Sequence, residues 1–257
     1  MGHPAFIHSD LIRSLGLFGD RIQDKSEAGF VKAALDYLNQ EFGPDLIFPA
    51  FNFDFPTRGV FDMENDPVQV GMIPEMLRGH KDFCRSWIPF FSTLSQGPSP
   101  IDYSPHCFPL GQDSIFQWLT KNDATLVFMG CSLEAMTYIH YAESLIPGGP
   151  VYRYDKKFTG NILGDEKSRP ISCTMHVRPM GLDIAYDFDQ LKGDLRSQNI
   201  LLPHDPQGIM ETASCTQILA HFLEHYEKDP LYGLTPDSKR KLETHTRKGR
   251  LRLQDFE

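Results

Sequence analysis

The sequence lacks the apolar segments that mark membrane and secreted proteins. No run of residues approaches the ~20 apolar residues that a membrane-spanning helix needs. Residues 1–5 do not combine a basic region with a following apolar run, as a secretory signal would. Low-complexity tracts are also absent, and 40% of the 257 residues are hydrophobic, which suffices for a large buried core. We therefore expect a folded, cytoplasmic protein that does not insert into a membrane.

Closely spaced cysteines and an excess of basic residues are both missing. The cysteines are far apart and form no CxxC pair: Cys84, Cys107, Cys131, Cys173 and Cys215. This spacing disfavours a zinc site and a disulfide framework. The formal net charge of −9 disfavours nucleic acid or an anionic membrane as a partner, and it is compatible with a cationic substrate such as an amine. Many cytosolic proteins are equally acidic, so the charge alone identifies no function.

The common signatures of nucleotide binding and of serine hydrolases are absent. Neither G-x-G-x-x-G after an expected strand nor G-x-x-x-x-G-K-[ST] occurs. The segment 130–132, Gly-Cys-Ser, does not fit the G-x-S-x-G nucleophile elbow. A ligand that carries phosphate would then need helix N-termini or dispersed basic residues such as Arg78, Lys81 and Arg85. Ordinary surface charge is the alternative explanation of these three residues.

Apolar patterns predict one α/β domain. A strand at 5–8, an amphipathic helix with capping-box spacing at Asp24 and Glu27, and an apolar run at 46–53 form a βαβ unit. The run 124–130 predicts a strand covered on both faces, and a helix from Ser132 to about Leu145 follows it. The other expected elements are helices at 73–78, 114–119, 209–226 and from Thr235, strands at 151–154 and 171–178, and loops at 54–66 and 97–111.

The expected helix after residue 130 carries polar residues at intervals of three. At this spacing Thr137, His140 and Glu143 lie on one side of a helix. A neutral histidine accepts a proton near pH 7, and a carboxylate within hydrogen-bonding distance orients it and raises its basicity. The pattern therefore suits proton transfer, whereas a solvent-facing polar stripe is the simpler explanation. A metal site is disfavoured, because no third protein ligand accompanies His140 and Glu143.

Cys131 is a further candidate, since it lies at the start of the same expected helix. A helix N-terminus can lower the pKa of a thiol and so make it a nucleophile. A small buried apolar residue is the simpler explanation of a cysteine at this position.

Several segments share an ordered pattern with one known family. The most specific segments are 126–130 and 137–143, and the pattern runs from about residue 5 to 155, more than half of the chain. It further includes 7–16, 46–53, 71–78 and the positions Arg85, Ser86, Pro89, Ser92 and Gly97. Taken together, these segments resemble the aminoglycoside 3-N-acetyltransferase family.

The resemblance implies a single three-layer α/β/α domain over 1–257, with a central mixed sheet and with acetyl-CoA or another acyl-CoA as acyl donor. It implies that His140 is the general base, that Glu143 orients it, and that Thr137 donates a hydrogen bond near the thioester. No metal and no covalent intermediate are expected. Residues assigned to cofactor binding are His8, Ser9, Arg78, Arg85 and Ser92. Residues 5–155 are expected to hold the CoA site and the catalytic residues, and 156–257 to shape the acceptor pocket.

The chain departs from the family pattern in two places, and the first of them bears on the acceptor. Members that modify antibiotics usually have a histidine where this chain has Ile88, and many members have a leading helix before the first strand. We therefore expect N-acyl transfer to an amino sugar, and to a nucleotide-linked one by analogy with members associated with polysaccharide biosynthesis. The alternatives are an aminoglycoside acceptor, a CoA-binding protein of the same fold without catalysis and, more distantly, a hydrolase that uses Cys131. The sequence allows a homodimer without predicting one.

Overall fold

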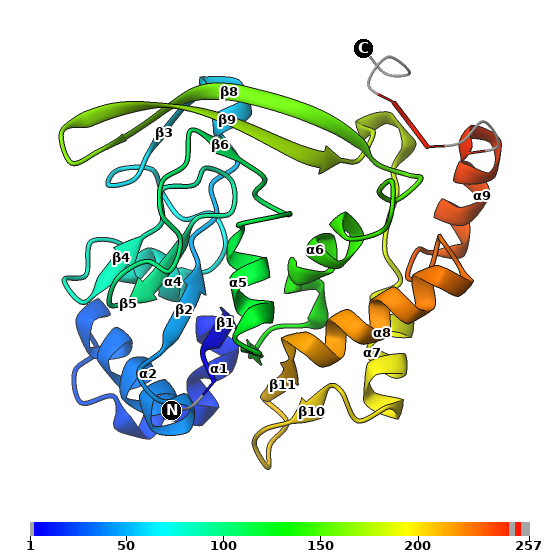
Figure 1. The fold of residues 1–257 in the computed structure, drawn as a ribbon. Coiled ribbons are helices and arrows are strands. Elements are labelled where there is room, and N and C mark those ends of the chain that lie inside the picture. Colours follow the sequence, from blue (N-terminus) through cyan, green and yellow to red (C-terminus); the bar gives the residue numbers. More distant parts are fainter. Residues whose placement is uncertain (1–2, 247–249, 253–257) are drawn as a thin grey trace.

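The structure, a computed structural model, describes residues 3–246 and 250–252 (Figure 1). Its α-helices are α1 (Leu11–Phe18), α2 (Glu27–Phe42), α3 (Phe55–Arg58), α4 (Met72–Leu77), α5 (Ile115–Lys121), α6 (Tyr138–Ser144), α7 (Phe188–Ser197), α8 (Cys215–Lys228) and α9 (Pro236–Thr246). Short 3-10 helices are η1 (Gly19–Arg21), η2 (Leu133–Ala135) and η3 (Met180–Leu182). The strands are β1 (Ala5–Ser9), β2 (Leu46–Pro49), β3 (Val60–Asp62), β4 (Phe83–Arg85), β5 (Thr93–Gln96), β6 (His106–Cys107), β7 (Thr125–Met129), β8 (Tyr154–Gly164), β9 (Lys167–Val177), β10 (Leu202–Pro203) and β11 (Met210–Ser214).

A mixed sheet with the strand order β10-β11-β7-β1-β2-β5-β4 forms the centre of the molecule. β1 lies between β2 and β7 and is parallel to both, so Phe6 is in register with Ile47 and with Leu126. The outer strands join antiparallel, β5 to β2, β4 to β5, β11 to β7 and β10 to β11. The apolar runs expected at 5–8 and 124–130 are thus adjacent central strands, because a strand covered on both faces needs apolar residues throughout.

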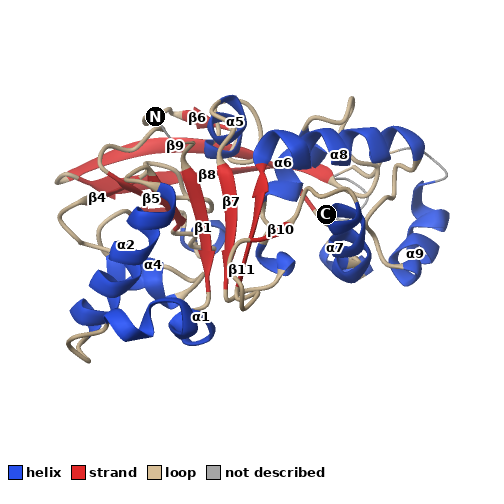
Figure 2. Ribbon diagram, turned by 90° about the horizontal axis from the view of Figure 1, so that it is seen from below, coloured by secondary structure: helices blue, strands red, loops and turns tan. Residues whose placement is uncertain are grey.

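Helices cover both faces of the central sheet (Figure 2). Alternate residues of β1 point to opposite faces. Ile7 belongs to a cluster with residues of α1, α2 and α4, whereas Phe6 belongs to a second cluster with residues of α5, α6 and α8. The expected three-layer α/β/α architecture with a central mixed sheet is confirmed. Among the described residues, no helix has both the length and the apolar character to cross a bilayer.

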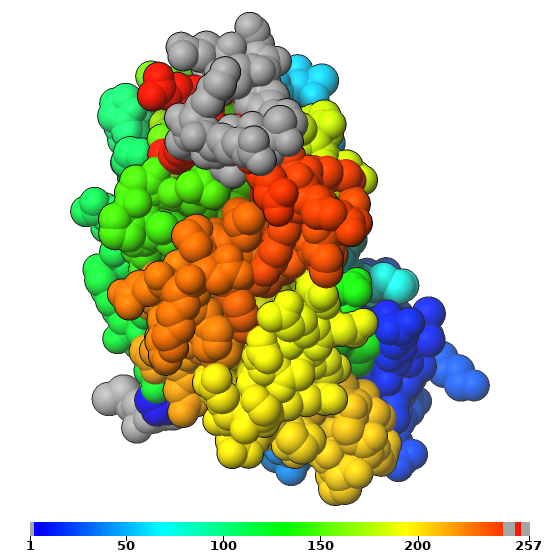
Figure 3. Space-filling model, turned by 90° about the vertical axis from the view of Figure 1, so that its right-hand side faces the viewer, coloured from blue at the N-terminus to red at the C-terminus, as the bar shows by residue number. Residues whose placement is uncertain are grey.

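The last three helices gather on one side of the molecule (Figure 3). α8 packs against α5 and α6, and α9 starts at the expected position after Thr235. Leu242 of α9 packs in a small cluster with Tyr152, Ile184 and Leu234. This cluster joins α9 to the turn that follows α6.

A second sheet has the strand order β3-β8-β9-β6, and its long antiparallel hairpin β8–β9 crosses the top of Figure 1. Every second residue of β8 from Asp155 to Asn161 is exposed, which explains the polar alternation of this segment. The strand expected at 151–154 is wrong, because the chain turns there and the Arg153 amide donates to the Pro150 carbonyl (3.1 Å). The strand expected at 171–178 corresponds to the second half of β9.

Two expected helices are only partly present. The helix expected from Ser132 is broken into η2 and α6, and α6 begins at Tyr138. Of the helix expected at 209–226, residues 210–214 instead form β11, which pairs with β7. The Ser214 hydroxyl then caps α8 by accepting a hydrogen bond from the Gln217 amide. Strand pairing with the buried β7 therefore overrides the apolar helical pattern at these residues.

The remaining differences concern helix starts and short elements. Ser26, not Asp24, caps α2, because its hydroxyl accepts from the Gly29 amide (3.2 Å) while Asp24 accepts from the Ser26 amide (3.0 Å). α1, which Asp10 caps, and α7, which Asp187 caps, were not expected. The loop expected at 54–66 contains α3 and β3, and the loop expected at 97–111 contains only the two residues of β6.

Candidate active site

α6 brings together two of the residues that the sequence singled out. The Nδ1 atom of His140 lies 3.1 Å from Oε2 of Glu143, three residues further along the helix. The Glu143 side chain is fully buried, whereas 24% of the His140 side chain is exposed. The carboxylate of the pair is therefore shielded from solvent, whereas the imidazole remains partly accessible to it.

Thr137 lies beside this pair but outside the helix itself. It occupies the N-cap position of α6, and its carbonyl accepts a hydrogen bond from the His140 amide (3.0 Å). Thr137 and His140 line the same cavity. The prediction that residues at intervals of three lie on one side of a helix thus holds for His140 and Glu143. Thr137 lies at the same cavity but belongs to the turn before α6.

Three residues around Glu143 were not predicted from the sequence. Nε of Arg153 lies 2.7 Å from Oε2 of Glu143, and the Tyr152 hydroxyl donates to Oε1 (2.6 Å). The Tyr186 hydroxyl also donates to Oε1. Tyr152 and Arg153 lie between α6, which ends at Ser144, and β8, which begins at Tyr154, and this position is the only sequence signal that they offer. Tyr186 comes from the segment before α7 and has no local signal.

Glu143 is ionised because of these neighbours. Burial by itself raises the pKa of Glu143, but the Arg153 charge and the hydrogen bonds from His140 and Tyr152 lower that pKa to about 2. The charge of a buried carboxylate is stable only when it is paired and hydrogen-bonded. Arg153, with 5% of its side chain exposed, supplies that pairing.

His140 is neutral near pH 7 for a related reason. Burial lowers the pKa of His140, the positive charge of Arg153 lowers it further, and Glu143 partly offsets both effects. The imidazole is therefore available as a proton acceptor over a wider acidic range than an exposed histidine.

The surroundings of Nδ1 determine which nitrogen of His140 accepts the proton. Nδ1 faces Glu143, Nη2 of Arg153 (3.0 Å) and the Tyr186 hydroxyl (3.4 Å). Glu143 is the acceptor for a proton on Nδ1; in that tautomer Nη2 of Arg153, which can only donate, bonds to the Tyr186 hydroxyl (2.8 Å), and the lone pair lies on Nε2. No described protein group forms a hydrogen bond with Nε2. In this tautomer Nε2 is the nitrogen that can accept a proton from a ligand.

A cavity of about 450 Å³ lies next to His140. Its polar lining includes Glu134 and Thr137 on one side and Arg178, Asp183 and Tyr186 on the other. The second group belongs to the segment after β9, within the part of the chain that is expected to shape the acceptor pocket, although none of its residues was singled out from the sequence. The cavity therefore offers carboxylates and one guanidinium group to a polar ligand.

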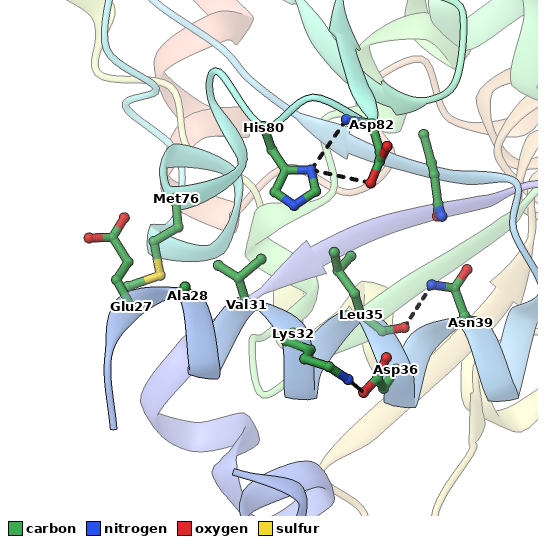
Figure 4. Close-up of a pocket in the computed structure, with 11 residues that line it drawn as sticks. Glu27, Ala28, Val31, Lys32, Leu35, Asp36, Asn39, Met76, His80 and Asp82 are labelled. Atoms are coloured by element: carbon green, nitrogen blue, oxygen red, sulfur yellow. Dashed lines mark hydrogen bonds and ion pairs between the residues drawn. The ribbon is translucent and has the colours of Figure 1, made fainter. Parts of the chain in front are cut away.

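A larger cavity of about 530 Å³ lies between α2 and α4, away from His140 (Figure 4). Two pairs of its polar side chains contact each other, Lys32 with Asp36 (2.5 Å) and His80 with Asp82 (3.9 Å). It contains none of the residues around Glu143. This cavity is larger than the one beside His140, but its size alone does not make it part of the active site.

His8 and Ser9 end β1 with polar atoms that have no protein partner. His8 is 4% exposed, stacks on Phe128 and lies on the face of the sheet that α6 covers. Burial lowers its pKa to about 3, so its ring is neutral. Nε2 of His8 and Oγ of Ser9 are buried without a hydrogen bond among the described residues. Buried polar atoms without a hydrogen bond are rare in proteins and need an explanation. Contact with a bound ligand is one such explanation.

Arg85 and Ser92, assigned to the cofactor from the sequence, are engaged within the protein. The Arg85 guanidinium donates to Ser92 Oγ (3.2 Å) and to the Ala50 (2.8 Å) and Asp66 (2.5 Å) carbonyls. The Ser92 hydroxyl donates to Ala50 as well (2.5 Å). Both residues are buried. They tie the end of β2 to β5 and to the loop after β3, and a ligand would have to replace these bonds.

Arg78 is also paired, although part of it remains exposed. Its guanidinium forms three hydrogen bonds with Glu75, the shortest at 2.7 Å, and another with the Glu64 carbonyl (3.0 Å). The structure thus brings Arg78 close enough to Arg85 for their charges to interact, but Glu75 neutralises Arg78 locally. Arg78 and Arg85 both serve internal contacts of the protein, and this explains why two basic residues occur close together in the sequence.

Neither a metal centre in the described part of the chain nor a reactive thiol at Cys131 is evident. No group of three or more His, Cys, Asp or Glu side chains is placed to hold a metal ion there. Burial raises the pKa of Cys131 to about 12, so this thiol is protonated near pH 7. A protonated thiol is a poor nucleophile, and the hydrolase alternative loses its main support.

The structure is similar to several solved structures, aminoglycoside acetyltransferases among them. Aminoglycoside acetyltransferase AAC(3)-IVa, as apoenzyme, matches 91% of this chain and 85% of its own length at 20% identity, with a TM-score of 0.63. AAC-IIIb in a binary complex with CoASH matches 88% and 90% at 16% identity, with a TM-score of 0.66. The YokD protein from Bacillus subtilis matches 90% and 89% at 15% identity, also with a TM-score of 0.66. At these identities the similarity establishes the fold.

The family assignment comes from the sequence itself. No curated protein matches the chain. A family model described as aminoglycoside 3-N-acetyltransferase matches residues 49–221, which is more than half of the chain. The match includes α6 with His140 and Glu143, and also Arg153 and Tyr186. The chain belongs to the aminoglycoside 3-N-acetyltransferase family, whose members are acetyl-CoA-dependent N-acetyltransferases.

Proposed function

We propose that this protein transfers an acetyl group from acetyl-CoA to the amine of an amino sugar, with His140 as general base. One observation carries the proposal: Nδ1 of His140 is held by the ionised Glu143, whereas Nε2 has no described protein partner, beside a polar cavity. A base oriented in this way suits direct attack of an amine on a thioester.

In the proposed reaction, Nε2 of His140 removes a proton as the amine nitrogen attacks the thioester carbonyl. The C–N bond forms, the C–S bond breaks, and the proton passes from His140 to the departing thiolate. Glu143 stabilises the transient imidazolium through Nδ1–H, and Arg153 keeps Glu143 ionised throughout. Thr137 lies at the same cavity and is our candidate for a donor to the oxyanion.

The acceptor is proposed from the lining of the cavity. Glu134 and Asp183 suit a cationic amino group, and Arg178 suits a phosphate of a nucleotide-linked sugar. Ile88, where antibiotic-modifying members usually have a histidine, is 6% exposed and packs in the core, so it offers no polar contact to an acceptor. Residues 178–188 supply much of this lining, which supports an acceptor role for the part of the chain after residue 155.

An aminoglycoside is the second candidate acceptor. Solved structures of an AAC(3)-IVa mutant contain apramycin and a gentamicin, and the acidic groups of the cavity suit such polycationic ligands. A panel of nucleotide-linked amino sugars and aminoglycosides, assayed by release of the CoA thiol from acetyl-CoA, separates the two candidates. Turnover with neither class would contradict the proposal.

His8 and Ser9 are our candidates for contact with the acyl donor, because their buried polar atoms lack protein partners. We expect His8→Phe to raise KM for acetyl-CoA by about 5- to 10-fold, the loss of one hydrogen bond. Stability should be unchanged or slightly higher, since the variant buries no unpaired polar group. Initial rates at varied acetyl-CoA and a thermal melt test both points. An unchanged KM would remove His8 from the donor site.

The protonation state of His140 can be measured directly. We expect its imidazole to titrate below the ordinary value of about 6.5, because burial and Arg153 lower its pKa. NMR titration of histidine-labelled protein, with His140→Gln to assign the resonance, measures this value. A titration at or above the ordinary value would mean that Glu143 outweighs burial and Arg153, and that much of the base is protonated near neutral pH.

A further inference from the structure

Two cysteines that take no part in the proposed reaction face each other in the second sheet. Sγ of Cys107 in β6 lies 2.6 Å from Sγ of Cys173 in β9. Both are free thiols, Cys173 buried and Cys107 partly exposed. The two sulfur atoms are closer than non-bonded sulfur atoms pack, although 66 positions separate the residues in sequence.

The backbone at this point already suits a covalent bond. Cys107 and Cys173 are direct register partners in the parallel pairing of β6 with β9. Neighbouring strands lie about 4.8 Å apart, within the separation of about 4.4–6.8 Å that Cα atoms of a disulfide adopt. Bond formation therefore needs small side-chain movements and no rearrangement of the sheet.

The pair also lies where a bond has structural consequences. β6 is a short strand in the proline-rich loop 97–111, and only His106 and Cys107 pair with β9. A cavity of about 280 Å³ adjoins it, and its lining includes residues 108, 110 and 111 of this loop, residue 112 directly after it, and 174–176 of β9. The carbonyl of His176 in turn accepts a hydrogen bond from Nη1 of Arg153 (3.0 Å). A bond at Cys107 would brace the strand that supports Arg153.

We propose that Cys107 and Cys173 form a reversible intramolecular disulfide by reaction with a small-molecule disulfide such as glutathione disulfide. The Cys107 thiolate attacks glutathione disulfide, which forms a mixed disulfide and releases one glutathione. The Cys173 thiolate then attacks the Cys107 sulfur, releases the second glutathione and closes the protein disulfide. Two protein thiols are oxidised, one glutathione disulfide is reduced to two glutathiones, and the thiol protons end on those products.

The two cysteines have different roles in this exchange. Cys107 is partly exposed and is the sulfur that a solution disulfide reaches first. The hydrogen bond with Cys107 and burial both raise the pKa of the Cys173 thiol. Cys173 is therefore a slow, protected partner that resolves the mixed disulfide, and closure should be faster at alkaline pH.

The test uses the whole protein, treated with glutathione disulfide or with dithiothreitol. We expect two thiols to be lost on oxidation, counted with a thiol reagent after denaturation, and a cross-linked peptide containing Cys107 and Cys173 in a non-reduced digest. Dithiothreitol should restore both thiols. Cys84→Ser, which removes the exposed cysteine of β4, should still lose two thiols, whereas Cys107→Ser should lose none to an internal bond.

Stability distinguishes a bond in the native fold from one made by an opened form. Closing a loop of this length should raise Tm by about 5 °C or more. A lower Tm after oxidation, an unchanged thiol count, a different cysteine pair, or a glutathione adduct that persists on Cys107 would each overturn the proposal. These outcomes are independent of whether acetyl transfer is observed.

Discussion

Replacing His140 by alanine should lower kcat/KM for acetyl transfer by about 10²- to 10⁴-fold, the usual contribution of a general base. Without the imidazole, no described group at this position both accepts a proton from the amine and returns it to the thiolate. Fold stability should change little, because His140 is partly exposed and Glu143 keeps its bonds to Arg153, Tyr152 and Tyr186. Release of the CoA thiol measures the rate, and circular dichroism checks the fold.

His80→Ala is the matched control for this substitution. Its side chain is 34% exposed, against 24% for His140, and it likewise faces a carboxylate, but in the distant cavity of Figure 4. It should keep full activity. If His140→Ala retained wild-type turnover, the base would have to be sought elsewhere. If both variants lost activity equally, the loss would reflect general damage to the protein.

Replacing Arg153 by methionine should destabilise the protein by about 3–5 kcal/mol and abolish turnover. Arg153 and Glu143 are 5% and 0% exposed, and removal of one partner leaves a buried charge without compensation. Lys239→Met is the control, because its ion pair with Asp229 (2.8 Å) is 32% and 46% exposed and contributes less than about 1 kcal/mol. Urea unfolding measures both variants.

A second variant separates the charge of Arg153 from its packing. Arg153→Met combined with Glu143→Gln removes both charges, so it should recover part of the lost stability while remaining inactive. Equal destabilisation of the single and double variants would show that Arg153 acts through packing and its bond to the His176 carbonyl.

The pH dependence of this effect has a definite sign. In the wild type the pKa of Glu143 is about 2, below its ordinary value of 4.5, so its stabilising contribution is complete above 4.5 and is lost as pH falls towards 2. In Arg153→Met burial remains and raises that pKa, so Glu143 takes up a proton at mildly acidic pH. The stability difference between the two proteins should therefore shrink from pH 7 to pH 4. A constant difference would exclude this linkage.

The sequence predicted the parts of the site that are local and left out the parts that are not. Strand β7, with its continuous apolar run, and the spacing of His140 and Glu143 depend on neighbours within a few residues, and the structure agrees with both. Tyr186 reaches Glu143 across 43 positions, a contact that no local pattern encodes. The assignment of Arg85 to the cofactor drew on closeness in sequence, whereas the fold uses its guanidinium to join separate loops.

The same limit applies to the fold. The central strands are apolar on both faces and stand out, but the β8–β9 hairpin has one exposed face, so its polar residues obscure it. Residues 210–214 continue an apolar helical pattern and become a strand only because β7 offers a free edge. In both segments a strand partner that is distant in the sequence determines the conformation, so the local pattern does not predict it.

The origin of the residues around Glu143 has a consequence for the synthesis of the protein. His140 and Glu143 both lie before residue 145, but the groups that bond to the carboxylate come later in the sequence, Arg153 within a few residues and Tyr186 only after the whole hairpin. A nascent chain that has exposed α6 alone carries a carboxylate without its guanidinium and hydroxyl partners. The complete set of bonds around Glu143 can therefore form only after residue 186 has been synthesised, which is later than both strands of the hairpin.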